Sequence, residues 1–122
     1  MRTRVNVVLL GAVVMLAACA LFAFAQPKGQ EVTIQGELVD LWCYMASGAR
    51  GAEHKACAVA CAKAGNPIGI VDAEGNVYLC MGGKDKDPAR EMLIEKMADT
   101  VTVTGIVVKK GGMQAVFISS LK

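Results

Sequence analysis

The chain has 122 residues, which is room for one small domain and excludes a multidomain enzyme. Its apolar content of 54% is high because a continuous apolar stretch runs from Val5 to Ala25. Without the first 25 residues, which contain Arg2 and Arg4, the net charge falls from +2 to zero, with 11 basic and 11 acidic residues left. A neutral domain argues against nucleic acid or an anionic membrane surface as a partner, since both require clustered positive charge.

The N-terminal 25 residues predict a signal peptide, because two arginines precede an apolar run over residues 5–18. Ala23-Phe24-Ala25 meets the small-x-small rule of signal peptidase, so we favour cleavage before Gln26. Leu16-Ala17-Ala18-Cys19 also fits a lipoprotein lipobox, and the whole apolar stretch is long enough for an uncleaved anchor. All three alternatives predict a periplasmic or secreted domain that attaches to a membrane only through this anchor or a lipidated Cys19.

Residues 26–31 form a short linker containing Pro and Gly, and we expect a single domain over residues 32–122. Alternation of apolar and polar residues from Val32 to Leu38 predicts a first strand. An alanine-rich segment over 53–64, stopped by Gly65-Asn66-Pro67, predicts a helix. Two short apolar runs over 68–71 and 77–81 flank a loop with Gly and Asn, which predicts an antiparallel hairpin.

The second half predicts one more helix and one more hairpin. Asp87 and Pro88 suit the start of a helix that reaches about Asp99 and presents its apolar face to a core. Strong alternation over 100–110, a turn at Gly111-Gly112 and a return over 115–121 predict the final hairpin. We therefore expect a mainly β fold with two helices, a small OB-like five-stranded barrel with the first helix inserted between strands 1 and 2.

The inserted helix carries a stripe of metal-binding residue types. His54, Cys57 and Cys61 have the spacing i, i+3 and i+7, which places their side chains along one face of a helix. Cys43 follows the first strand and Cys80 closes the third, and in an OB-like order both lie at the rim where the helix sits. We expect all five side chains to converge there.

Three functions compete for these residues. Thiolates and imidazole suit Cu(I) or Zn(II), and Met45 and Met81 add thioethers that favour Cu(I). An even number of cysteines in a small exported domain instead suggests two disulfides, and such a stapled scaffold would dock an unidentified envelope protein through the same rim. Thiol redox activity is a third alternative, although the Cys-x-x-Cys motif is absent. We expect a binding module and not an enzyme.

Several segments resemble small, uncharacterised exported bacterial proteins: Gly36-Glu37-Leu38-Val39-Asp40 leading to Cys43, His54-x-x-Cys57-x-x-x-Cys61, Gly65, and Val101-Thr102-Val103-Thr104-Gly105. The resemblance covers the chain from Gln35 to the C-terminus and implies a signal peptide, a Cys/His helix and an OB-like β ending. It implies no particular activity. Cys80 and Trp42 lie outside the shared pattern, so the resemblance implies a core of three cysteines and one histidine, which fits a metal site better than two disulfides.

Overall fold

The computed structural model describes residues 27–86 and 88–122. The predicted signal peptide, Cys19 and the helix-capping Asp87 lie outside these ranges. Within them, none of the helices has the length and apolar character needed to cross a membrane.

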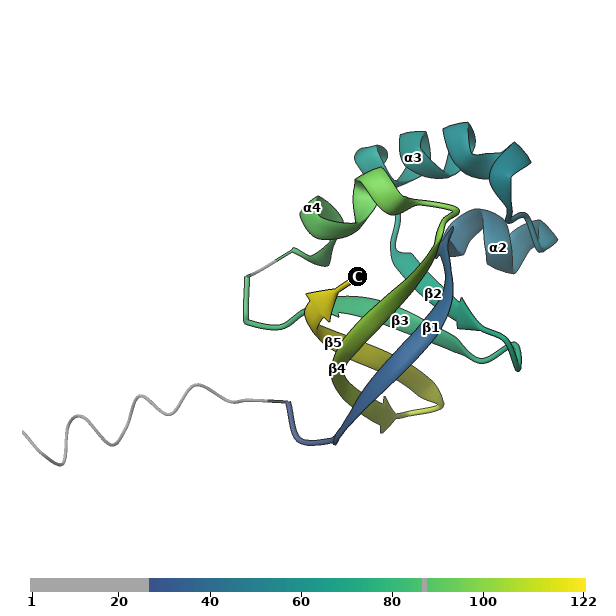
Figure 1. Ribbon diagram of the computed structural model, residues 1–122. Coiled ribbons are helices and arrows are strands. Elements are labelled where there is room, and N and C mark those ends of the chain that lie inside the picture. Colours follow the sequence, from purple (N-terminus) through teal and green to yellow (C-terminus); the bar gives the residue numbers. More distant parts are fainter. Residues whose placement is uncertain (1–26, 87) are drawn as a thin grey trace, which may run out of the picture.

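The described chain folds into five strands, three α-helices and two 3₁₀-helices. In chain order these are β1 (Gln30–Asp40), α2 (Leu41–Ser47), η1 (Ala52–His54), α3 (Lys55–Ala64), β2 (Ile68–Asp72), β3 (Val77–Gly82), α4 (Ala89–Leu93), η2 (Ile94–Lys96), β4 (Thr100–Lys110) and β5 (Met113–Leu121). The strands close into a barrel in the order β1-β2-β3-β5-β4. Neighbours are antiparallel except β3 and β5, which are parallel. The predicted OB-like barrel with its Cys/His helix between β1 and β2 is confirmed, and the three helices gather at one end of it (Figure 1).

Strand β1 closes the barrel because it pairs with two neighbours. Gly36 lies opposite Asp72 of β2 and also opposite Val101 of β4. A Cβ atom at this position would lie 2.4 Å from the carbonyl oxygen of Val71, so the close approach of the strands requires glycine.

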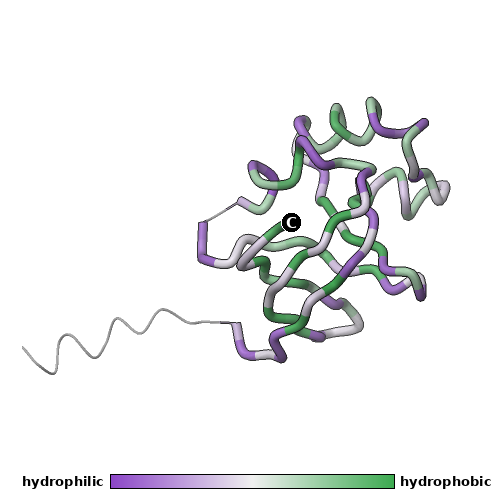
Figure 2. Tube along the Cα trace, in the orientation of Figure 1, coloured by the Kyte–Doolittle hydropathy of each residue, from purple (hydrophilic) through white to green (hydrophobic). Residues whose placement is uncertain are grey.

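The core fills the barrel and extends under the helices. Figure 2 shows apolar residues recurring along the strands, and many of them are buried. The largest fully buried apolar side chains of the described chain are Leu38, Val39, Ile70, Leu93, Met97, Val103, Val116 and Ile118. Leu93 of α4 and the following Met97 have no exposed surface, which confirms that this segment plugs the core.

Two helices differ from the predictions. Helix α2 was not expected, so the fold has three α-helices and not two. The helix expected to reach Asp99 ends earlier, because α4 stops at Leu93 and η2 at Lys96. Ala98 has φ of +64° and donates its N–H to the carbonyl of Leu38, so this segment leaves the helix to pair with β1.

Candidate metal centre

Helix α2 begins directly at the end of β1, which places Cys43 at one end of the barrel. Asp40 caps the helix, since its carboxylate oxygens accept the backbone N–H groups of Trp42 at 3.3 Å and Cys43 at 3.2 Å. Leu41 donates its N–H to the carbonyl of Pro67 at 3.0 Å and packs its side chain over Gly69 of β2. The barrel strands on both sides of the insertion therefore fix the first turn of α2.

The loop between α2 and η1 is held to the barrel by one side chain. Gly48 ends α2 in the left-handed conformation, with φ of +71°. The Glu37 carboxylate of β1 then accepts the backbone N–H of Gly51 and forms an ion pair with Arg50 at 3.4 Å. These contacts set the position at which the chain enters η1 and reaches His54.

Helix α3 presents two adjacent stripes. Ala58 and Ala62 are buried in the core cluster, and their small side chains let the helix lie close to the barrel. Cys57 and Cys61 each precede one of these alanines and are exposed and half-buried respectively. The helix ends at Gly65, and Asn66 donates its N–H to the carbonyl of Cys61 at 3.1 Å. Docking of the alanine stripe thus aims the cysteine stripe toward α2.

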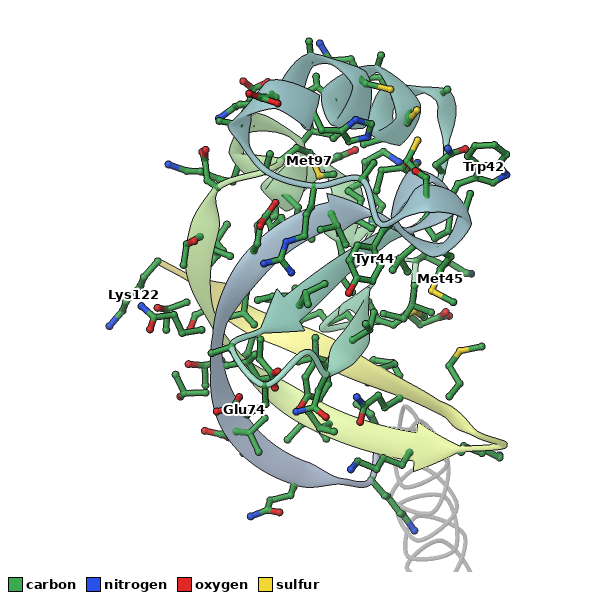
Figure 3. The ribbon with its side chains drawn as sticks, turned by 90° about the vertical axis from the view of Figure 1, so that its right-hand side faces the viewer. Trp42, Tyr44, Met45, Glu74, Met97 and Lys122 are labelled. Atoms are coloured by element: carbon green, nitrogen blue, oxygen red, sulfur yellow. The ribbon has the colours of Figure 1, made fainter. Side chains whose placement is uncertain are left out.

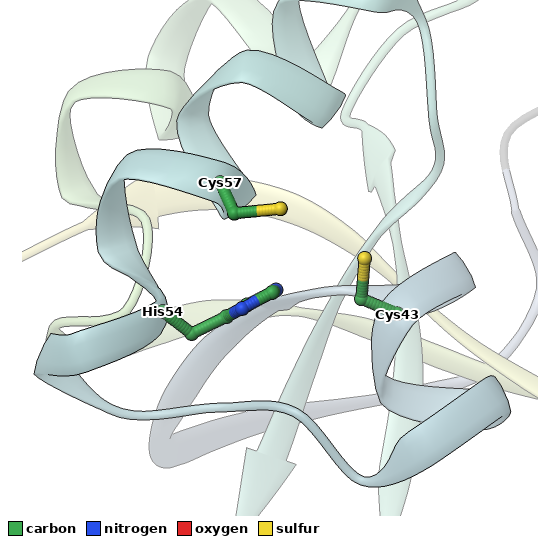
Figure 4. A group of neighbouring side chains, drawn as sticks. All are labelled: Cys43, His54 and Cys57. Atoms are coloured by element: carbon green, nitrogen blue, oxygen red, sulfur yellow. The ribbon is translucent and has the colours of Figure 1, made fainter.

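The structure brings together four of the five predicted site residues, which we call the Cys/His cluster: Cys43, His54, Cys57 and Cys61. The ligand atoms of Cys43, His54 and Cys57 lie within 4.8 Å of one another, and in Figure 4 they point into the same space between α2 and α3. A second group with the same spacing contains Asp40, Cys43 and Cys61. Cys43 belongs to both groups, and the sulfurs of Cys57 and Cys61 are 3.9 Å apart.

His54 contributes a nitrogen that has no hydrogen-bond partner among the described residues. Its Nε2 atom is buried, and a nitrogen of the same ring lies in the group formed with the sulfurs of Cys43 and Cys57. A buried polar atom without a partner costs about 1–3 kcal/mol, so such atoms are rare unless something else satisfies them. A metal ion bound to this atom would satisfy it.

The carboxylate of Asp40 controls the neighbouring thiol. It accepts a hydrogen bond from the Cys43 thiol, and together with burial and the nearby Cys61 this raises the pKa of Cys43 to about 12. Burial raises the pKa of Cys61, and its hydrogen bond with Cys57 acts in the same direction. Burial alone would raise the pKa of Asp40, but hydrogen bonds from Cys43, Asn66 and Trp42 outweigh it and lower that pKa. Without a metal, the thiols of Cys43 and Cys61 are therefore protonated at neutral pH.

Cys80 does not join the cluster, which corrects the prediction that all five side chains converge. Its position in β3 is near the expected rim, but strand alternation turns the side chain into the barrel, where only 8% of it is exposed. Cys80 belongs to the core cluster, and burial raises its pKa to about 12. All four described cysteines are free, so the expected pair of disulfides is not formed in this structure.

The methionines expected to assist the site lie on the surface. Met45 is 74% exposed and points outward from α2, as does the nearby Trp42 (Figure 3). Met81 is also exposed, on the β3 position that follows the inward-facing Cys80. These positions do not support the expectation that thioethers complete the cluster.

Sequence reasoning missed Asp40 as a site residue. The signal was present, because an aspartate that ends a strand and precedes a helical turn is a preferred helix cap. Recognising the cap would also have predicted α2 and placed the carboxylate beside Cys43.

No protein-family model matches the chain, and searches of curated proteins and of solved structures also found no match. The resemblance to exported bacterial proteins therefore stays a prediction. The geometry of the site itself shows a Cys/His cluster whose ligand atoms are close enough to hold a metal ion.

Proposed function

We propose that this protein binds a soft or borderline metal ion, Cu(I) or Zn(II), through Cys43, His54 and Cys57. Two observations at His54 carry the proposal: one ring nitrogen lies within 4.8 Å of the sulfurs of Cys43 and Cys57, and its buried Nε2 atom has no hydrogen-bond partner in the described chain. Two thiolates and an imidazole are a donor set for Zn(II) and Cu(I), whereas Ca²⁺ and Mg²⁺ prefer oxygen ligands.

The setting of the cluster favours binding and delivery over catalysis or a closed structural role. Cys57 is exposed, so an ion can be gained or transferred without unfolding the barrel. The ligand atoms come from α2, η1 and α3, which lie at one end of the barrel (Figure 1), and this placement preorganises them for an ion. Export belongs to the same proposal and is supported by the apolar segment and small-x-small motif of residues 1–25.

The direct test compares the metal affinity of the mature protein with that of single variants. Replacing His54 by Ala removes the ligand nitrogen and should weaken binding by more than the roughly 10–100-fold that loss of an outer-shell partner costs. Cys80→Ala is the matched control, because it removes a thiol from the core and should leave affinity unchanged. Equal weakening by both variants, or no binding by the parent protein under reducing conditions, contradicts the proposal.

Thiol redox activity is a second candidate, favoured by the 3.9 Å distance between the sulfurs of Cys57 and Cys61. Intact mass separates the alternatives on protein purified from the periplasm, because each disulfide removes two hydrogens. Mass loss together with an absence of metal would favour redox activity or a disulfide-stapled scaffold that docks an envelope partner. The same spectrum distinguishes cleavage before Gln26 from lipidation at Cys19.

A further inference from the structure

Asp40 is a buried charge for which the described chain supplies no cation. Its side chain has 0% exposed surface, and it is the buried charged residue of the described core. The ion pairs found among the described residues are Arg50–Glu37 and Lys55–Asp99, and neither includes it. Backbone N–H groups of Trp42 and Cys43 solvate the carboxylate but carry no net charge. Buried carboxylates are normally paired with a cation or bound to a metal, so a positive partner is missing here.

The ligand atoms around Asp40 are those of a second metal position. One carboxylate oxygen lies within 4.8 Å of the sulfurs of Cys43 and Cys61. A carboxylate has about four acceptor sites, and Asp40 accepts from two backbone N–H groups, the Asn66 side chain and the Cys43 thiol. The last of these bonds is lost when Cys43 becomes a thiolate ligand, which frees one acceptor site for an ion. One oxygen and two thiolate sulfurs suit Zn(II), whereas Cu(I) prefers sulfur and imidazole.

The two ends of the site, His54 and Asp40, belong to different ligand groups. His54 ends η1, whereas Cys61 lies in α3, seven residues further along the chain. Neither of the two ligand groups found in the described chain contains both residues. An ion bound beside His54 leaves Asp40 without a cation, and an ion bound beside Asp40 leaves the His54 Nε2 atom without a partner.

We propose that the site holds two Zn(II)-class ions bridged by the Cys43 thiolate, one with His54 and Cys57 and the other with Asp40 and Cys61. This inference rests on the proposed metal-binding function. Three thiolates and one carboxylate carry four negative charges, which two divalent ions balance while His54 stays neutral. Binding therefore releases three thiol protons to solvent for each pair of ions.

Native mass spectrometry of the reduced, zinc-saturated protein tests the proposal by counting ions per chain. The parent protein should hold two ions. His54→Ala should hold one, as should Cys61→Ser and Asp40→Asn, because each removes a ligand from one position only. Cys43→Ser should hold none, since it removes the bridge, and Cys80→Ala should still hold two.

Each count has a distinct meaning. No ion in the parent protein overturns the proposed function itself. One ion at saturation overturns the second metal position and leaves the first intact. Retention of two ions by Cys61→Ser would overturn the assignment of Cys61 as a ligand of the second position. X-ray absorption at the zinc edge adds an independent reading, since a shared thiolate should bring the ions to about 3.5–4 Å, the spacing of two-metal sites. Two bound ions without a short metal–metal distance would overturn the bridge.

Discussion

The Oδ2 atom of Asp40 lies 3.2 Å from the backbone nitrogen of Cys43, so the last residue of β1 directly positions a thiol of the cluster. The same carboxylate accepts a hydrogen bond from that thiol and raises its pKa to about 12. One buried side chain thus ends the strand, begins the helix and keeps Cys43 protonated at neutral pH. Helix formation and thiol chemistry are coupled at this residue.

We predict that Asp40→Asn and Asp40→Ala separate these two roles. Asparagine keeps an oxygen that can cap α2, whereas alanine should cost about 0.5–2 kcal/mol of stability, measured by urea unfolding of the reduced apoprotein. Both variants remove the negative charge, so the pKa of Cys43 should fall from about 12 toward its ordinary value of 9.0 in an ultraviolet thiolate titration. An unchanged Cys43 pKa in both variants would show that another group raises it.

A second prediction concerns the packing of α2 on β2. A Cβ atom at position 69 would lie 2.5 Å from Cδ2 of Leu41, so Gly69→Ala should displace the first turn of α2. Overpacking of this kind typically costs about 1–3 kcal/mol, and moving Cys43 should also weaken metal binding. The double variant Gly69→Ala with Leu41→Ala restores space and should recover part of the affinity. If the double variant binds metal no better than Gly69→Ala alone, displacement of α2 is not the cause.

The sequence predicted the barrel well because its signals are local and periodic. Alternation identified β1 and β4, short apolar runs around a Gly/Asn loop identified β2 and β3, and Gly111-Gly112 located the turn before β5. The helical stripe of His54, Cys57 and Cys61 was likewise readable, since spacing fixes which side chains share a helix face. These parts of the fold depend on contacts within or between neighbouring segments.

The rest depends on contacts between segments distant in the sequence. Cys80 reaches the expected end of β3, but the pleat turns it inward, and a shift of one residue would have reversed that outcome. The early end of α4 depends on the hydrogen bond from Ala98 to Leu38, which links positions 60 residues apart. The apolar run of β3 is too short to show from the sequence which of its side chains face the core. No local sequence pattern predicts the hydrogen bond between Ala98 and Leu38.

We predict that the apoprotein loses stability at alkaline pH because of the buried thiol of Cys80. Burial raises its pKa from 9.0 to about 12, so the folded state binds the thiol proton more tightly than the unfolded chain does. The resulting stability is fully present below about pH 9 and is lost as the pH rises toward 12. Urea unfolding of the reduced apoprotein should show this loss, and Cys80→Ala should show a smaller one despite a lower stability at neutral pH. Parallel stability curves for the two proteins would contradict the assignment.

The last prediction concerns Glu37, which holds the loop between α2 and η1 by accepting the Gly51 N–H. Glu37→Ala removes that acceptor and frees the loop that leads to His54, so metal affinity should fall by about 10–100-fold, as for other outer-shell partners. Glu37→Gln keeps an oxygen acceptor and should retain most of the affinity. Arg50→Ala is the control for the ion pair, because the Arg50 side chain is 52% exposed and such pairs contribute about 0–1 kcal/mol. If Arg50→Ala weakens binding as much as Glu37→Ala does, the ion pair and not the loop hydrogen bond positions His54.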